Sequence, residues 1–186
     1  MSINQIFLVN FHMEIEVFLA SVDEKPILRN LMQLYLYEFS TIDNEDVDND
    51  TGLFSFPYLD RYWIEPERYP FIVRVDGNLA GFALLRKGSC FPNTEDQIET
   101  GMIVAEFFVM RKYRRTGVGT KLAIDLFNRF PGRWEVAQVA ENHRGQIFWR
   151  SVIGEYCQGN YEEIELDDEI WKGPVQVFDN KSFFRE

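Results

Sequence analysis

The sequence predicts an α+β domain built on a mixed, mostly antiparallel sheet, and three observations support this prediction. Strand-like apolar runs and helix-like apolar periodicities follow one another without the regular alternation of a doubly wound fold. Near the middle of the chain three strand-like runs occur in succession, two of them joined by the turn signal Asp76-Gly77-Asn78. With 186 residues, 46% of them hydrophobic, the chain is long enough for one domain over residues 1–186.

The N-terminal part combines a stretch without a pattern, a strand and a helix. Residues 1–12 show no clear periodicity, and we expect an extension of uncertain order there. Residues 14–19 alternate well enough for a first strand. Asp23 followed by Pro26 is typical of a helix start, and apolar residues then recur at helical spacing. We therefore expect a helix that runs to about Phe39.

A polar segment and then an aromatic segment follow this helix. Five carboxylates occur between Asp43 and Asp50, but the central glycine and the closing glutamate of an EF-hand are missing. This spacing favours a solvated loop over a calcium loop. Residues 54–63 hold five aromatic side chains, which is too much ring surface for an exposed linker. We expect part of this segment to be core or the wall of a binding site.

The middle of the chain is expected to be mainly strand. Residues 71–75 and 79–85 are the two arms of the predicted hairpin. Residues 88–100 are polar and are expected to form a connection. Residues 102–109 are nearly all β-branched or aromatic, which predicts a third strand, with Glu106 as its only ionisable residue.

The C-terminal third mixes helical and strand-like patterns, and Pro131-Gly132 is typical of a helix end. We expect, in order, a helix from about Gly117 to Phe130, a strand over residues 134–140, a helix from Asn142 to near Gly154, and strands over residues 156–166 and 174–178.

Composition limits the classes of partner. The net charge of −11 argues against a nucleic-acid partner and mildly favours a cationic one, although many cytosolic proteins are acidic for solubility alone. Cys90 and Cys157 are expected to be reduced thiols, with a disulfide or a ping-pong catalytic thiol as the alternative. With only His12 and His143 beside these cysteines, we expect no metal. No apolar run approaches the roughly 20 residues that span a bilayer. We expect a cytoplasmic protein without a membrane partner.

A basic, glycine-bearing loop at residues 109–120 lies between the third strand and a helix start, which is typical of phosphate binding. A P-loop has Lys and then Ser or Thr directly after its second glycine, whereas Gly119 is followed by Thr120 and only then by Lys121. A dinucleotide-binding fingerprint has a third glycine three residues after Gly119, and Leu122 stands there. Both nucleotide-binding motifs are therefore excluded.

A third pattern fits this loop. Residues 114–119 match (Gln/Arg)-x-x-Gly-x-(Gly/Ala), and at this point the chain resembles the GCN5-related N-acetyltransferases. The resemblance covers about residues 70–156 and includes the hairpin, the strand that ends at Val109, and a helix that begins at Asn142. Two residues depart from the usual family pattern, because Trp149 stands where a tyrosine is common and Glu155 where a phenylalanine is common.

The resemblance implies a fold and a cosubstrate. It implies a central sheet of about six to seven strands, flanked by about four helices and splayed between the fourth and fifth strands. It also implies that acetyl-CoA binds there as cosubstrate, with the pantetheine arm in the splay and the pyrophosphate on the loop. The cofactor-binding residues expected from it are Phe108, Val109, Met110, Arg114, Arg115, Thr116, Gly117, Val118, Gly119, Thr120, Asn142 and Trp149.

The implied reaction is direct attack of a neutral amine on the thioester, which needs a base and a proton donor for the leaving thiolate. Glu106 is the predicted base, because burial among apolar residues raises the pKa of a carboxyl group toward neutrality. An alternative is that Glu106 faces solvent or pairs with an arginine. An indole N–H at Trp149 is too weak an acid, so Tyr156 or water is the predicted proton donor.

The resemblance leaves the acceptor open between a small cationic amine and a protein amino group. Tyr35, Tyr58, Tyr62 and Trp63 are the predicted acceptor-binding residues, with core packing as the alternative. The rival function is a non-catalytic acyl-CoA-binding sensor, which the substitution at Trp149 keeps open. Terminal strands such as residues 174–178 build dimers in some members of this family, so a homodimer is also open.

Overall fold

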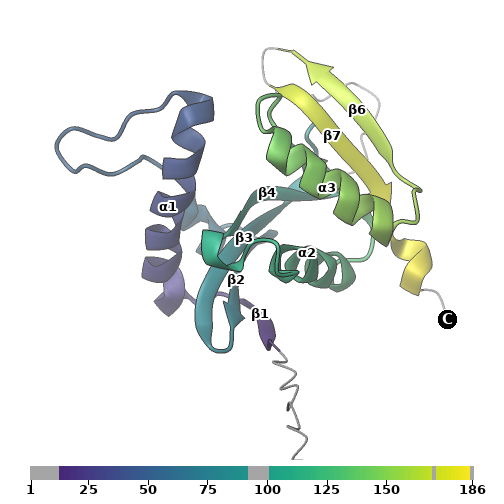
Figure 1. The fold of residues 1–186 in the computed structure, drawn as a ribbon, viewed down its shortest axis with the longest axis horizontal. Helices are drawn as coiled ribbons and strands as arrows, with labels where there is room; N and C mark the ends of the chain where they lie inside the picture. Colours follow the sequence, from purple (N-terminus) through teal and green to yellow (C-terminus); the bar gives the residue numbers. More distant parts are fainter. Residues whose placement is uncertain (1–12, 92–100, 169–170, 185–186) are drawn as a thin grey trace, which may run out of the picture.

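The computed structural model of the chain describes residues 13–91, 101–168 and 171–184. Its centre is a seven-stranded sheet with the order β1-β2-β3-β4-β5-β7-β6 (Figure 1). Adjacent strands are antiparallel except β4 and β5, which are parallel. The strands are β1 Ile15–Leu19, β2 Arg68–Val75, β3 Asn78–Gly88, β4 Gly101–Val109, β5 Arg133–Ala137, β6 Glu162–Asp167 and β7 Lys172–Asp179. The predicted mixed sheet is confirmed, and residues 1–12 and most of the predicted connection lie outside the described residues.

Three α-helices cover this sheet in the described part of the chain, rather than the four or so expected. They are α1 Lys25–Asp43, α2 Val118–Arg129 and α3 His143–Tyr156. The other helical segments described are short 3₁₀ helices, such as Leu59–Trp63. Figure 1 shows α1 on one side of β3 and β4, and α2 with α3 on the other. None of the described helices is both long enough and apolar enough to cross a membrane.

The alternation of side chains along the strands divides the interior into two clusters. On β3, Phe82 and Leu84 pack under α1, whereas Ala83 and Leu85 pack under α2 and α3. Each strand in the middle of the sheet is covered on both faces, which is why β2, β3 and β4 are nearly continuous apolar runs.

The predicted hairpin between β2 and β3 is confirmed, and its turn follows from local chemistry. Asp76 and Gly77 both have positive φ, 49° and 75°, as the tight turn of a two-residue hairpin requires. The Asp76 carboxylate accepts a hydrogen bond from the Glu14 amide at 2.9 Å, which ties β1 to the turn.

Two element ends differ from the prediction. Helix α1 continues past Phe39 into the first part of the acidic segment, and it ends at Asp43 because Asn44 takes the left-handed conformation with φ 53°. The strand predicted from residue 156 was wrong at its start. Tyr156 is the last residue of α3, and β6 begins only at Glu162.

Strand β4 has two irregularities that open the sheet, a bulge opposite β3 and a short pairing with β5. Leu84 pairs with Glu106 and Leu85 with Val104, so Ala105 is the extra residue of a β-bulge. Strands β4 and β5 pair only at their beginnings, where Met102 lies opposite Trp134. Beyond that point the two strands diverge, so the predicted splay between the fourth and fifth strands is confirmed.

Gly81 of β3 is expected to be essential for this arrangement. A Cβ at Gly81 would lie 2.0 Å from the Phe108 carbonyl oxygen on β4, so any side chain there must push the two strands apart. We expect Gly81→Ala to lower the free energy of unfolding by about 3 kcal/mol, a fall in Tm of roughly 6–12 °C.

Gly154→Ala is the matched control for this prediction. Gly154 lies in α3, and a Cβ there would meet only Tyr161 Cε1, at an ordinary 3.8 Å. This substitution is expected to leave the Tm unchanged or to raise it slightly, because Ala favours the helix over Gly. Equal melting temperatures for the two variants would contradict the close approach of β3 and β4.

Candidate active site

A cleft of about 500 Å³ opens where β4 and β5 diverge. The bulge places two consecutive β4 residues, Ala105 and Glu106, on its wall. The chain that continues from β5 forms the facing wall through residues 137–139. Helix α1, the segment of residues 55–58, Asn142 and Trp171 supply the remaining sides. Glu106, the predicted base, is therefore one of the carboxylates that line this cleft.

Burial controls the charge of Glu106. Loss of hydration raises the pKa of its carboxyl group from 4.5 to about 7, and this effect is larger than a hydrogen bond from Tyr35, which lowers the pKa. The negative charge of Asp43 raises it further. Tyr35 is buried beside it, and burial together with Glu106 raises the pKa of the tyrosine well above 10. Tyr35 is therefore a neutral hydrogen-bond donor to a carboxylate that is half ionised near neutral pH.

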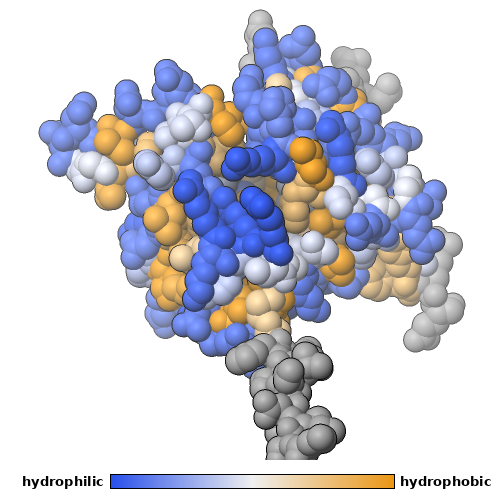
Figure 2. All heavy atoms as spheres, in the orientation of Figure 1, coloured by the Kyte–Doolittle hydropathy of each residue, from blue (hydrophilic) through white to orange (hydrophobic). Residues whose placement is uncertain are grey.

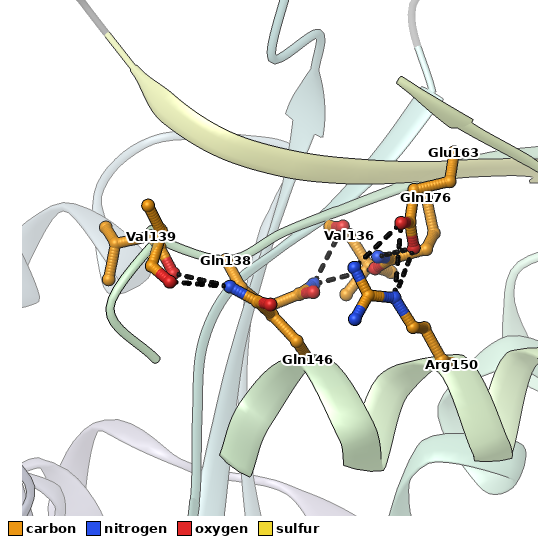
Figure 3. A network of polar contacts seen from close by, with 8 residues as sticks. Val136, Gln138, Val139, Gln146, Arg150, Glu163 and Gln176 are labelled. Atoms are coloured by element: carbon orange, nitrogen blue, oxygen red, sulfur yellow. Dashed lines mark hydrogen bonds and ion pairs between the residues drawn. The ribbon is translucent and has the colours of Figure 1, made fainter. Parts of the chain in front are cut away.

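A chain of directed hydrogen bonds fixes the side chain of Gln138, which lines the cleft (Figure 3). Arg150 of α3 binds the Glu163 carboxylate through Nε and a terminal nitrogen at 2.8 Å each. Glu163 accepts a hydrogen bond from Gln176 Nε2 at 2.8 Å, and Gln176 Oε1 accepts one from Gln138 Nε2 at 2.8 Å. Because a carboxylate only accepts, it determines the orientation of both amides in turn.

This order leaves one oxygen of the cleft wall without a partner. Gln138 is 3% exposed, and its Nε2 also donates to the Val136 carbonyl oxygen at 2.9 Å. Its Oε1 is buried and makes no hydrogen bond in the described structure. The Nε1 of Trp171, another cleft residue, is likewise buried without a partner among the described residues.

Gln138 and Trp171 were not among the predicted site residues. Gln138 lies within the strand predicted over residues 134–140, and nothing in the neighbouring sequence distinguishes it from an exposed strand residue. In the structure β5 ends at Ala137, so Gln138 is the first residue after the strand. A polar side chain one residue beyond a buried strand is nevertheless a signal, because the ends of strands line sites in open sheets.

The glycine loop has the geometry of an anion-binding turn. Arg115 and Gly117 both have positive φ, 60° and 89°, and Gly117 is the N-cap of α2. The Thr116 hydroxyl donates to the Tyr113 carbonyl oxygen at 2.7 Å and so closes the turn. The first amides of α2 have no carbonyl partner within the helix, and a Cβ at Gly117 would meet nothing within 4 Å.

Gly119 serves a different purpose from Gly117. A Cβ at Gly119 would lie 3.2 Å from the Phe148 ring of α3 and 3.7 Å from Val109 at the end of β4. The absence of a side chain thus lets α2 begin directly against both elements. The two glycines of the sequence pattern therefore have separate causes, an open backbone at Gly117 and close packing at Gly119.

The arginines of the loop are not equivalent. Arg114 donates from Nε to the Val109 carbonyl oxygen at 2.7 Å and pairs with Glu38 of α1 at 2.7 Å. Arg111 also pairs with Glu38, at 3.1 Å. Arg115 makes no ion pair among the described residues. Figure 2 shows hydrophilic side chains gathered at the centre of this face, where Figure 1 shows the loop between β4 and α2.

The end of β4 is where a pantetheine arm was predicted to bind. Phe108 is buried in the cluster under α1, and Val109 is buried under α2. The Met110 amide donates to the Ala80 carbonyl oxygen at 2.8 Å, and the Met110 carbonyl accepts from the Tyr113 amide at 2.8 Å. Both main-chain groups of Met110 are thus paired within the chain.

The remaining predicted residues lie at the start, the middle and the end of α3. Asn142 caps it by accepting a hydrogen bond from the Gly145 amide at 3.0 Å, and it lines the cleft. Trp149 is 5% exposed and packs against Phe107, with ring centroids 4.8 Å apart. Tyr156 lies at the other end of the helix, where its hydroxyl donates to Asn128 at 2.8 Å. The structure does not bring Tyr156 together with Glu106.

The predicted acceptor-binding residues divide into two pairs. Tyr35 and Tyr58 line the cleft. Tyr62 is 5% exposed and belongs to the cluster under α1, with the Arg68 guanidinium 5.3 Å from its ring centre. Trp63 donates from Nε1 to the Ala20 carbonyl oxygen at 3.1 Å. The structure thus brings Tyr35 and Tyr58 together with Glu106 and leaves Tyr62 and Trp63 outside the cleft.

Comparisons with known proteins match the sequence to a family model and the structure to known folds. The family model described as "Acetyltransferase (GNAT) family" matches residues 29–154, which is more than half of the chain. No curated protein gives a significant match. The structure is similar to those of many solved proteins, of which three illustrate the range.

All three solved structures are acetyltransferases by their descriptions. A GNAT-family acetyltransferase from Staphylococcus aureus aligns with a TM-score of 0.59 and 14% identity, over 90% of this chain and 100% of that one. The PaiA N-acetyltransferase from Thermoplasma acidophilum, in complex with coenzyme A, aligns with a TM-score of 0.54 and 12% identity, over 89% of this chain and 99% of that one. An aminoglycoside 6′-N-acetyltransferase from Acinetobacter baumannii aligns with a TM-score of 0.57 and 12% identity, over 86% of this chain and 99% of that one. At identities this low, the structural similarity shows a shared fold alone.

Proposed function

The chain belongs to the GNAT acetyltransferase family, and we propose that it transfers an acetyl group from acetyl-CoA to a primary amine of a small cationic metabolite or a protein. One observation above all supports this proposal. Glu106, whose pKa is raised to about 7 by burial, lines a cleft at the divergence of β4 and β5. A carboxylate with this pKa is well suited to accept a proton from an amine near neutral pH.

The glycine loop fits the phosphates of the cosubstrate. The open backbone at Gly117 and the free amides at the start of α2 would hold the pyrophosphate, and the positive end of the helix dipole favours it. Arg115, which has no ion pair among the described residues, is the arginine best placed for a phosphate. Arg114 is better assigned to bracing the loop, because Glu38 and the Val109 carbonyl already occupy its guanidinium.

Acetyl-CoA, when bound, supplies the acetyl group as a reactive thioester. The residues of the chain have the other tasks. Glu106 takes a proton from the acceptor ammonium, directly or through one water, and Tyr35 orients the carboxylate by its hydrogen bond. Because Tyr156 lies at the far end of α3, bonded to Asn128, we assign the proton for the thiolate to water.

Binding of acetyl-CoA should stabilise the protein by mass action. A ligand at about 100 times its Kd adds about 2.7 kcal/mol, which corresponds to a rise in Tm of roughly 5–10 °C for a chain of this size. Thermal unfolding with and without acetyl-CoA measures this. No shift at millimolar acetyl-CoA would contradict every function that depends on this cofactor.

Release of free thiol in the presence of a panel of amines then tests the transfer itself. The expected result is thiol release that requires both acetyl-CoA and an amine, with one acetylated amine per thiol. A stabilised protein that acetylates no amine or protein amino group would support the alternative of a non-catalytic acyl-CoA sensor.

A further inference from the structure

The cleft is surrounded by carboxylates that have no positive partner. Asp43, Glu45 and Glu106 line it, and none of them forms an ion pair in the described ranges. Among the described residues, no Lys, Arg or His lines the cleft. Partial loss of hydration raises the pKa of Asp43, and the charges of Glu45 and Glu141 add to this effect. Like charges that repel one another in this way are stabilised by a cation that binds between them.

An independent feature of the opposite wall also requires a hydrogen-bond donor. Gln138 is 3% exposed, and its Oε1 is buried without a partner. Exchanging the oxygen and nitrogen of the Gln138 amide would not help. The Nε2 position lies beside two acceptors, the Val136 carbonyl oxygen and Gln176 Oε1, and therefore has to be a donor (Figure 3). The orientation of Gln176 follows in turn from the acceptor-only carboxylate of Glu163. The unpaired atom is therefore an acceptor, and an N–H group satisfies it.

The remaining surface of the cleft suits an alkyl chain between charges. Aromatic rings of Tyr35, Phe39, Phe56 and Tyr58 line it on the side of α1. Their faces attract ammonium groups and their apolar surface packs against methylene groups. The carboxylates come from separate parts of the lining, Glu106 from β4 and Asp43 and Glu45 from the end of α1 and the segment that follows it. An extended organic cation with more than one ammonium group fits charges distributed along a ring-lined cleft in this way.

We propose that the acceptor is an aliphatic diamine or longer polyamine that binds with one ammonium beside Glu106 and a second beside Asp43 and Glu45 at the mouth of the cleft. Gln138 Oε1 accepts a hydrogen bond from an N–H of the acceptor. This inference rests on the proposed acetyl transfer and names the substrate class of that same site. The bound ligand supplies positive charge to the carboxylates and a hydrogen-bond donor to Gln138 Oε1.

The test compares two acceptors that differ only in the second charge. We expect kcat/KM for 1,4-diaminobutane to exceed that for 1-aminobutane by about tenfold or more, mainly through KM, because the second ammonium meets Asp43 and Glu45. Added salt should reduce this ratio. In the double variant Asp43→Asn with Glu45→Gln, the ratio should fall toward one.

A second double variant controls for net charge. Asp46→Asn with Asp50→Asn also removes two negative charges from this acidic segment, but neither residue lines the cleft. The diamine preference of this variant should equal that of the native protein. An equal loss of preference in both double variants would mean that only the overall field matters, and it would overturn the proposed subsite.

Failure of this inference can be told apart from failure of the proposed function. If the diamine and the monoamine are acetylated at equal kcat/KM, or a peptide with a free amino terminus exceeds both, acetyl transfer stands and the diamine assignment is wrong. If no amine releases thiol from acetyl-CoA, the proposed function is wrong and this inference falls with it.

Discussion

Replacing Glu106 with Gln is expected to lower kcat by about 100-fold or more, since general base catalysis contributes roughly 10²–10⁴-fold. Gln has nearly the size and shape of Glu, so the β-bulge and the cleft should be preserved. The amide cannot take a proton from an ammonium group near neutral pH. Steady-state thiol release at saturating acetyl-CoA and amine measures this effect.

The same variant should bind acetyl-CoA as tightly as the native protein does. Glu106 lies on the cleft wall formed by β4, whereas the phosphates are expected at Gly117 and the start of α2. Titration calorimetry with acetyl-CoA is expected to give Kd values within about twofold of each other, which is less than 0.5 kcal/mol. If Glu106→Gln retained full turnover, Glu106 would be a structural carboxyl group and the base would have to be sought elsewhere.

Gly117→Ala is expected to weaken acetyl-CoA binding by about tenfold or more. None of the described residues lies within 4 Å of a Cβ at Gly117, so the methyl group would project into open space beside the N-terminus of α2, where we expect the pyrophosphate. A phosphate held there would lose at least one hydrogen bond to a charged group, worth about 1.5–3 kcal/mol. Titration calorimetry gives the change in Kd directly.

Backbone strain is the competing explanation for such a loss, and Gly77→Ala controls for it. Gly77 in the β2–β3 turn also has positive φ, and a Cβ there also meets nothing within 4 Å. Each substitution should destabilise the fold by about 1–2 kcal/mol, because Ala is strained in this conformation. Only Gly117→Ala should change the Kd for acetyl-CoA. Equal Kd values for both variants would contradict the assignment of the pyrophosphate to this loop.

The parts of the fold that follow from local chemistry were predicted from the sequence. The hairpin depends on a turn in which Asp76 and Gly77 accept positive φ, and such turns are encoded by neighbouring residues. The positions of β2, β3 and β4 follow from apolar runs that are buried on both faces. The glycine loop was recognisable because Gly117 and Gly119 stand at the start of a helix with a clear apolar face.

The misplaced element ends show where composition misled the prediction. Polar residues after Phe39 suggested a loop, although Asn44, with its tolerance of positive φ, was a signal for the end of α1. The sequence predicts the end of α3 near Gly154, but Gly154 lies within the helix, which ends at Tyr156. The turn after α3 comes at Gln158 and Gly159, which both have positive φ, and the Gly159 amide closes it on the Gly154 carbonyl oxygen at 2.9 Å.

The cleft itself depends on contacts between distant residues, and only part of it could be predicted. Glu106 could be singled out in the sequence as a candidate base, because a lone carboxylate in an apolar strand is unusual. Tyr62 and Trp63 were proposed from their aromatic character, but the short 3₁₀ turn directs Tyr62 into the core. The position of Gln138 at the end of a strand is a signal in the sequence, but its unpaired oxygen follows from a hydrogen-bond chain between α3, β6 and β7 that the sequence does not reveal.

The pH dependence of kcat/KM tests the central claim most directly, namely that the buried carboxyl group of Glu106 is the base. In the native protein the rate should rise with pH as a group with a pKa of about 7 loses its proton, since only the carboxylate accepts a proton from the amine. Deprotonation of the free amine adds a second rise at higher pH in every variant. Tyr35→Phe removes the hydrogen bond that lowers this pKa, so its first rise should move to higher pH.

The Glu106→Gln profile decides the question. We predict that the rise near pH 7 disappears in this variant, whereas the rise that belongs to the amine remains. If the native protein and Glu106→Gln gave superimposable profiles, both with a rise near pH 7, another group would carry that ionisation and the proposed role of Glu106 would be wrong.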